Sequence, residues 1–231
     1  MKIFEIRVKV TLLKDINYEN LTGKLCNFID MFIAKNEIFL EKHKNKGYKN
    51  YCFDTLYPLE KDKIYKKDKK YTFKIRSIDY DFINYFIENL SGHKNLDMEG
   101  MIDVIEIIHD GKMIDKIYSV TPVMIKTDQG YWRDILNVEK FEKRIKDRLF
   151  KIYREITKKE MDEKFELYNN IIFLNHKPIA VKYKDIKLLG DKVEMEISKD
   201  PRAQEIAQMI LGVGLGDNTS RGYGFVNYKW I

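Results

Sequence analysis

One stretch near the C-terminus decides the fold: Met209-Ile-Leu-Gly-Val-Gly-Leu-Gly-Asp-Asn-Thr-Ser-Arg-Gly-Tyr-Gly-Phe-Val-Asn-Tyr-Lys-Trp-Ile231. Five of the chain's 12 glycines fall between residues 212 and 224, after an apolar helical run and before an aromatic, β-branched run. This order predicts a glycine-lined bend from a helix into a strand, with Gly212 as the helix cap. Successive N–H groups in such a bend can bind anions, so the stretch indicates either a structural connection or a backbone surface for RNA.

The glycine cluster does not match the two common nucleotide-binding loops. A Walker loop needs Gly-Lys-Ser/Thr, which is absent from the sequence, and a dinucleotide fingerprint opens a helix after a strand. Here the glycines follow a helix and precede a strand. A cradle for a mononucleotide is therefore not expected.

Composition indicates a compact globular protein. The 231 residues are 44% hydrophobic with only four prolines, enough for one large core or two domains of about 110 residues each. A formal net charge of +6 permits a polyanionic partner. Cys26 and Cys52 stand in no metal or redox spacing, and Cys26 is expected to fill the core. Without an apolar run of membrane-spanning length or a signal peptide, we expect a cytoplasmic protein with no membrane partner.

Hydrophobic periodicity predicts the order β-α-β-β-α-β in the first half. The alternation at 3–12 is typical of a half-buried strand, and apolar residues between Leu21 and Phe32 recur at helical spacing after a cap at Asn17. The other expected elements are a turn capped by Asn36, strands at 51–57 and 70–77, a helix from Asp79 that Gly92 stops, and strands at 101–108 and 113–118 around an Asp110-Gly111 turn.

The same order is expected again in the second half. Its elements are strands at 119–125, 171–174, 179–183 and 192–197, a helix at 138–165, a helix started by Asp200-Pro201, and a last strand after the glycines. The prediction is an α+β protein of two tandem ferredoxin-like, RNA-recognition-type domains, 1–118 and 119–231, with the glycine stretch facing the cleft between them. On the long helix, Lys140, Arg144, Lys151, Arg154 and Lys158 could follow phosphates or form a solvated face.

The glycine stretch also resembles a known signature. Gly214-Leu-Gly216 followed by Asn218-Thr-Ser-Arg221-Gly222-Tyr-Gly224-Phe225-Val226 is similar to the C-terminal glycine-rich signature of the repeat-associated RNA-binding (RAMP) superfamily of CRISPR systems, and within it to the repeat-processing endoribonucleases, the sixth Cas family. Ser119-Val-Thr-Pro-Val-Met-Ile125, with Tyr131-Trp132, resembles the segment that opens the second domain of those enzymes. The resemblance implies CRISPR repeat RNA (pre-crRNA) as the partner.

Within that resemblance, the glycine stretch is the expected RNA-binding surface. Arg221 is the best candidate for a phosphate contact, and Tyr223 and Phe225 could stack on bases, although Phe225 could equally face the core. The predicted RNA-binding residues are Gly212, Gly214, Gly216, Asn218, Ser220, Arg221, Gly222, Tyr223 and Gly224.

Histidines are the candidates for chemistry. His43, His93, His109 and His176 have no metal-ligand spacing, so neither a metal nor a cofactor is predicted. The last three stand at turns or helix ends, where exposed polar residues are expected. Cleavage of RNA without a metal requires a base, an acid and cations on the phosphorane, and histidine suits the first two roles. His43 lies among lysines, which is also typical of a solvated basic loop.

The resemblance assigns the catalytic positions. In the family, a catalytic histidine follows the first helix and precedes a strand of the pattern Tyr/Phe-x-Phe-x-x-Leu; here Leu40-Glu-Lys-His43 precedes Tyr51-Cys-Phe-Asp-Thr-Leu56. His43 and, six positions on, Lys49 therefore match. The family's first-helix tyrosine is replaced by Phe28, so Tyr48 or Tyr51 could substitute, or His43 could act with lysines alone. The predicted site is His43, Lys49 and Tyr48.

The resemblance thus implies a metal-independent endoribonuclease. Attack by the RNA's own 2′-hydroxyl would leave a 2′,3′-cyclic phosphate and a 5′-hydroxyl. The alternative from the same resemblance is a non-catalytic scaffold subunit of a CRISPR effector complex. Association with other effector subunits and homodimer formation are left open.

Overall fold

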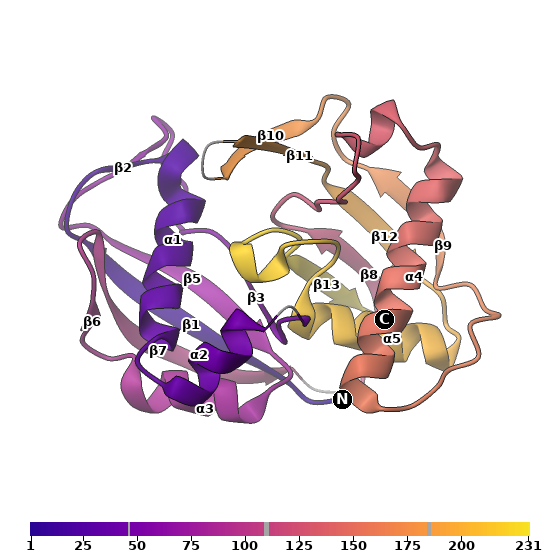
Figure 1. The fold of residues 1–231 in the computed structure, drawn as a ribbon, viewed down its shortest axis with the longest axis horizontal. Coiled ribbons are helices and arrows are strands. Elements are labelled where there is room, and N and C mark those ends of the chain that lie inside the picture. Colours follow the sequence, from indigo (N-terminus) through magenta and orange to yellow (C-terminus); the bar gives the residue numbers. More distant parts are fainter. Residues whose placement is uncertain (46, 109–110, 184–185) are drawn as a thin grey trace.

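The computed structural model describes residues 1–45, 47–108, 111–183 and 186–231. Its two halves stand side by side, with the indigo-to-magenta N-terminal half on the left and the orange-to-yellow C-terminal half on the right (Figure 1). Within the described ranges, no helix is both long enough and apolar enough to cross a membrane.

The N-terminal half is an antiparallel sheet with helices packed on it. The strand order is β3-β5-β1-β7-β6. Without the short β6, this is the 2-3-1-4 order of a ferredoxin-like domain. The elements are β1 (Ile3–Leu12), α1 (Tyr18–Ile33), α2 (Glu37–Lys44), β3 (Tyr51–Phe53), β5 (Lys70–Ser77), α3 (Tyr80–Asn89), β6 (His93–Lys94) and β7 (Met98–Ile108), with β2 (Ile16–Asn17) and β4 (Ile64–Tyr65) as a separate pair.

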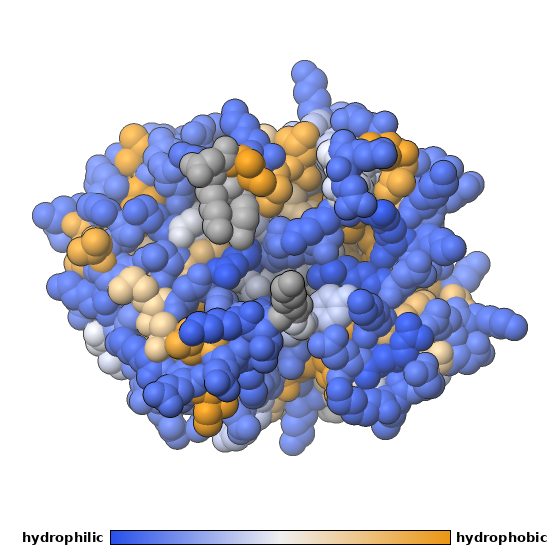
Figure 2. Space-filling model, viewed as in Figure 1, coloured by the Kyte–Doolittle hydropathy of each residue, from blue (hydrophilic) through white to orange (hydrophobic). Residues whose placement is uncertain are grey.

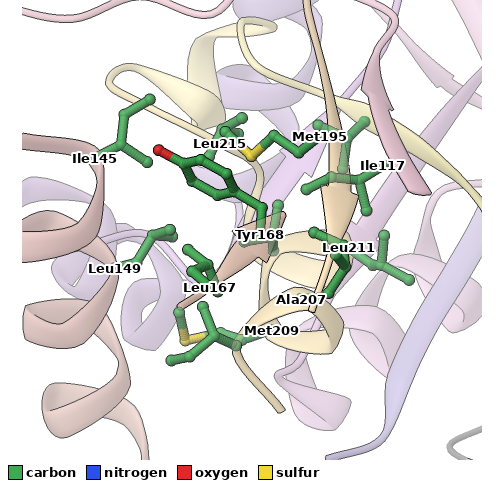
Figure 3. Packing of buried hydrophobic residues seen from close by; sticks show 14 of the residues in the cluster. Ile117, Ile145, Leu149, Leu167, Tyr168, Met195, Ala207, Met209, Leu211 and Leu215 are labelled. Atoms are coloured by element: carbon green, nitrogen blue, oxygen red, sulfur yellow. The ribbon is translucent and has the colours of Figure 1, made fainter. Parts of the chain in front are cut away.

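The C-terminal half repeats the topology. Its sheet order is β13-β8-β12-β9, and α4 and α5 supply the helical layer of the core. The elements are β8 (Ile114–Ser119), η1 (Trp132–Asp134), α4 (Val138–Thr157), β9 (Tyr168–Phe173), β12 (Val193–Ile197), α5 (Pro201–Val213), η2 (Thr219–Arg221) and β13 (Val226–Trp230), with β10 (Ile179–Tyr183) and β11 (Ile186–Gly190) as a separate hairpin. Figure 3 shows Ile145 and Leu149 of α4 packing toward Ala207 and Leu211 of α5 and Met195 of β12. The tandem ferredoxin-like prediction is confirmed.

The second half begins with β8, which was predicted to be the last strand of the first half. β8 pairs with β12 and β13, so the expected hairpin between 101–108 and 113–118 is wrong. Of the predicted strand at 119–125, Ser119 ends β8 and the rest forms only isolated bridges, at Val123 and Met124; Pro122 has no N–H to donate to a ladder. His109 and Asp110 of the expected turn lie outside the described residues.

The pairing of β8 bears on where the two domains divide. A division after residue 118 would place almost all of β8 with a sheet to which it does not pair. We propose that the two domains divide between Ile108 and Ile114. The long helix also ends earlier than predicted, at Thr157, because Lys158 adopts a left-handed conformation with φ 58°.

Buried interactions join the two halves. Arg76 of β5 is 2% exposed; it donates to Glu5 on the neighbouring strand at 2.6 Å and to the Val226 carbonyl of β13 at 2.5 Å. Its guanidinium lies 4.4 Å from the centre of the Phe225 ring. Helix α5 also packs against β1 and β5 of the first sheet. The end of the glycine stretch is therefore held directly against the N-terminal half.

Candidate active site between the two halves

One face of α1 lies against the C-terminal half. Thr22, Cys26 and Asp30 recur every four residues, so they share a helix face, and all three are half-buried. Figure 1 shows the yellow glycine region against α1. Phe28 lies on the other side, fully buried, where its ring meets His93 with ring centroids 4.7 Å apart. Position 28, which the resemblance associates with catalysis, therefore belongs to the core, and Asp30 reaches the junction instead.

His43 meets Asp30 and Arg221 at this junction. Asn36 caps α2 by accepting hydrogen bonds from the N–H groups of Ile38 and Phe39, and His43 projects from the last turn of that helix. Its Nε2 lies 3.2 Å from Asp30 Oδ1 and 3.1 Å from an Arg221 guanidinium nitrogen. Arg221 also forms an ion pair with Asp30. Three side chains from α1, α2 and the glycine region thus interlock.

This arrangement accommodates both protonation states of the imidazole. An arginine N–H can only donate, so its contact with Nε2 uses the ring's lone pair and belongs to the neutral form. A protonated ring instead donates from Nε2 to Asp30. His43 Nδ1 is buried and has no hydrogen-bond partner among the described residues. The site therefore fits a group that accepts and releases a proton at one nitrogen.

The charges around His43 act on their neighbours. Burial alone would raise the pKa of Asp30, but hydrogen bonds from His43 and Arg221 and their charges together hold that pKa below its usual value. Burial raises the pKa of the Cys26 thiol to about 12, which leaves it protonated and not nucleophilic. Burial and the Asp30 charge raise the pKa of Tyr51 as well, so its hydroxyl stays protonated.

The glycine loop, which we define as residues 214–225, delivers Arg221. Gly214, Gly216, Gly222 and Gly224 all have positive φ, and each lies where a Cβ would meet other atoms; at Gly222 it would come within 2.8 Å of the Phe53 ring. Such positions require glycine. The prediction of a bend between helix and strand is confirmed, but the helix cap is Gly214, because α5 continues through Gly212.

Most of the glycine loop is occupied with its own fold. The N–H groups of Gly214, Gly222 and Gly224 donate to the carbonyls of Ile210, Thr219 and Pro122, so they do not face a ligand. Tyr223 and Phe225 are buried, which favours packing over base stacking. The residues that reach the surface in part are Asp217, Asn218, Ser220 and Arg221. RNA contact by this loop stays a prediction.

Lys49 and Tyr48 lie beside His43 in different roles. Lys49 Nζ donates to the carbonyls of Lys42 and Asn45, 2.8 and 2.5 Å away, and so satisfies carbonyls at the end of α2. Burial and the nearby Arg221 lower the pKa of Lys49. The Tyr48 ring packs under the Arg148 guanidinium of α4, at 4.9 Å from the ring centre. Arg148 also donates to the Gly216 carbonyl at 2.8 Å and pairs with Asp217.

Two cavities flank the segment that carries these residues. One of about 300 Å³ is lined by Arg148 and Arg221 together with Lys126. The other, of about 400 Å³, is lined by His43 and Tyr51. Both include Tyr48 and Lys49. Around them, the face drawn in Figure 2 is mainly hydrophilic.

Sequence reasoning missed two residues of this junction, Asp30 and Arg148. In the sequence, Asp30 looks like an ordinary polar residue on the solvent side of a helix. Its partner Arg221 lies 191 positions further along the chain, so no local pattern joins the two. Arg148 was not among the predicted basic residues of α4, although it lies one turn after Arg144, whose guanidinium donates to the Lys126 carbonyl. The four-residue spacing of Cys26 and Asp30 on α1, and of Arg144 and Arg148 on α4, could have indicated that each pair shares a helix face.

The other histidines are not part of the site. His93 is buried, contrary to the expectation of an exposed turn residue, because its Nε2 contacts the Phe28 carbonyl at 3.1 Å. His176 is exposed. In the part of the chain that the structure describes, no group of three or more His, Cys, Asp or Glu side chains could hold a metal ion.

Known proteins are similar to this chain over nearly its whole length. A family model described as "CRISPR associated protein Cas6, C-terminal" matches residues 108–228. The chain is 22% identical to the CRISPR-associated endoribonuclease Cas6 2 of Methanocaldococcus jannaschii over 244 residues, covering 96% of this chain and 98% of that protein.

Solved structures share the fold. One described as "An RAMP protein binding different RNA substrates" has a TM-score of 0.72 at 20% identity, covering 98% of this chain and 99% of that one. The product of a Cas6-related gene from Pyrococcus furiosus has a TM-score of 0.66 at 20% identity, covering 97% and 98%.

Proposed function

The chain belongs to the Cas6 family of CRISPR-associated proteins, and on that premise we propose that it is an endoribonuclease that cuts CRISPR repeat RNA. The observation that carries the proposal is the meeting of His43, Asp30 and Arg221 across the two halves. A histidine that can exchange a proton beside a guanidinium that can bind a phosphate is what phosphodiester cleavage needs.

In the proposed reaction the nucleophile is the 2′-oxygen of the RNA. The phosphate next to the cut bond takes Arg221 as its partner, which frees the lone pair of His43 Nε2. His43 then removes the 2′-hydroxyl proton as the 2′-oxygen bonds to phosphorus. The P–O5′ bond breaks, leaving a 2′,3′-cyclic phosphate and a 5′-hydroxyl. No metal takes part in these steps.

Lys49 and Asp30 complete the assignment. Because burial and Arg221 lower the pKa of Lys49, its ammonium group is a better proton donor than a free lysine, and we assign it to the departing 5′-oxygen. Asp30 is a positioning residue: it holds Arg221 and accepts a hydrogen bond from His43 once the ring is protonated. Tyr48 supports the lysine-bearing segment through Arg148 and has no role in proton transfer.

The test is incubation of the protein with repeat RNA from its own genome in excess EDTA, followed by analysis of the product ends. Cleavage at one phosphodiester with a cyclic phosphate end is expected. Cleavage only after Mg²⁺ is added would overturn the metal-independent reaction. Tight binding without cleavage under either condition would instead identify an RNA-binding scaffold subunit.

A further inference from the structure

Arg148 of α4 contacts both segments that supply the candidate catalytic residues. Its Nε donates to the Gly216 carbonyl at 2.8 Å, and one terminal nitrogen pairs with Asp217 at 2.7 Å. The same guanidinium lies over the Tyr48 ring, 4.9 Å from its centre. One side chain of the C-terminal half therefore holds the glycine loop with its nitrogens and the residue before Lys49 with its face.

The segment that carries Lys49 has few other tethers. Residues 47–49 belong to no helix or strand, and their backbone forms no hydrogen bond with a described residue. The Lys49 ammonium group is tied to carbonyls at the end of α2, while the Tyr48 ring packs against the core of the C-terminal half. The position of Tyr48 limits where the backbone of Lys49 can lie, because the two are neighbours in the chain.

The surroundings of Arg148 fix its orientation. Asp217, its ion-pair partner, accepts a hydrogen bond from the Lys126 N–H and donates its own N–H to the Met124 carbonyl, both at 2.7 Å. A planar guanidinium held in this way at its nitrogens presents its face in one direction, which an ammonium group cannot do. Because Nε and one terminal nitrogen are already occupied, the geometry favours support of Tyr48 over binding of a phosphate.

We propose that Arg148 is a positioning residue for the general acid: it fixes Tyr48, and through Tyr48 it places the Lys49 ammonium group at the departing 5′-oxygen. This role rests on the proposed function and belongs to one half of it. In that half the P–O5′ bond breaks and Lys49 Nζ gives its proton to the 5′-oxygen, whereas His43 holds the proton taken from the 2′-hydroxyl. Arg148 therefore matters for departure of the leaving group and not for attack by the nucleophile.

The experiment compares single-turnover cleavage of natural repeat RNA with cleavage of the same RNA carrying sulfur in place of the bridging 5′-oxygen at the cut. A thiolate leaves without a proton, so the sulfur-substituted RNA makes the general acid unnecessary. Arg148→Met should cleave natural RNA about 10–100-fold more slowly than the wild type, but sulfur-substituted RNA within about threefold of the wild-type rate. Lys49→Ala should show the same pattern, and His43→Ala should be slow on both RNAs.

Two further variants locate the effect. Tyr48→Leu breaks the contact from the other side and should be slow on natural RNA only. The double variant Arg148→Met/Tyr48→Leu should be no slower than either single variant, because the two residues act as one unit. Arg202→Met is the matched control: this arginine lies 4.6 Å from the centre of the Phe165 ring, pairs with Asp200 at 2.7 Å and lines neither cavity. It should cleave both RNAs at the wild-type rate.

Three results would overturn this role. If Arg148→Met slows cleavage of both RNAs alike, or weakens repeat binding and reduces its salt dependence, Arg148 acts on the RNA or the fold, and the nuclease stands. Unchanged cleavage of natural RNA by Arg148→Met has the same meaning. Binding of both RNAs by the wild type without cleavage of either would overturn the nuclease and this role together. If melting curves show that Arg148→Met is unfolded, Tyr48→Leu alone decides.

Discussion

The glycine loop and the histidine segment, residues 43–45 and 47–50, face each other across the site and are built in opposite ways. The glycine loop is mostly buried, and all four of its glycines have positive φ. The described residues of the histidine segment are exposed or half-buried, and Lys49 ties the segment to α2. Packing dictates the conformation of the glycine loop, whereas the polar side chains of the histidine segment remain accessible to a ligand. Substitutions should therefore affect stability in one region and activity in the other.

The largest effect is expected at Gly224. A Cβ there would overlap the Leu215 carbonyl oxygen, and φ is 61°. Gly224→Ala should destabilise the fold by about 3 kcal/mol or more and lower the melting temperature by roughly 10 °C. Gly23→Ala, on α1 with open space around it, is the control and should stabilise by about 0.5–1 kcal/mol. A Gly224→Ala protein that melts with the wild type would refute the packing account of the loop.

His43→Ala should separate activity from stability. We expect single-turnover cleavage to fall by about 10²–10⁴-fold, because the proton acceptor is lost, while repeat affinity and melting temperature stay nearly unchanged. His176→Ala, at an exposed histidine outside the site, should cleave at the wild-type rate. Equal rates for the two variants would remove His43 from the chemistry.

Arg221 is the residue of the glycine loop that we propose contacts a phosphate of the RNA. Arg221→Gln should weaken repeat binding about tenfold and reduce the slope of log affinity against log salt by about 1, since one phosphate contact is lost. Lys158→Gln on the exposed end of α4 serves as the charge-matched control. If the salt slope is the same for Arg221→Gln and the wild type, the loop does not touch the backbone of the RNA.

Asp30 should produce the smallest effect, which is present at neutral pH and is lost in acid. Its folded pKa is held below its unfolded value of about 3.9, so its stabilising contribution is present above that value and is lost as the pH falls through the folded pKa. Asp30→Asn should therefore narrow the difference in unfolding free energy between pH 7 and pH 3 by roughly 0.5–1 kcal/mol. Urea denaturation at the two pH values measures it, and an unchanged difference would argue against the ion pair.

The fold could be predicted further from sequence than the site could. Alternation in β1 and the spacing of Leu21 to Phe32 in α1 are local signals, and the structure confirms both. The partners of β8 are not local: a short strand after Asp110-Gly111 looks like the second arm of a hairpin, and only the second sheet supplies β12 and β13. Burial of His93 depends likewise on where α1 packs.

The site shows the same limit. His43 and Arg221 were predicted because each stands in a recognisable pattern, but the pattern carries no information on what touches them. The resemblance points to position 28 on α1, whereas helix rotation turns Phe28 into the core and Asp30 toward His43. Contacts between residues from different halves follow from tertiary packing, which sequence periodicity does not encode.

The most direct measurement of the central claim uses a repeat RNA with a single 2′-deoxynucleotide at the cleaved position. Because the 2′-oxygen is the proposed nucleophile, the wild-type protein should bind this RNA as tightly as the natural one and leave it uncut in excess EDTA. Cleavage of the deoxy-substituted RNA at the same bond would contradict the account, since a different nucleophile would then carry the reaction.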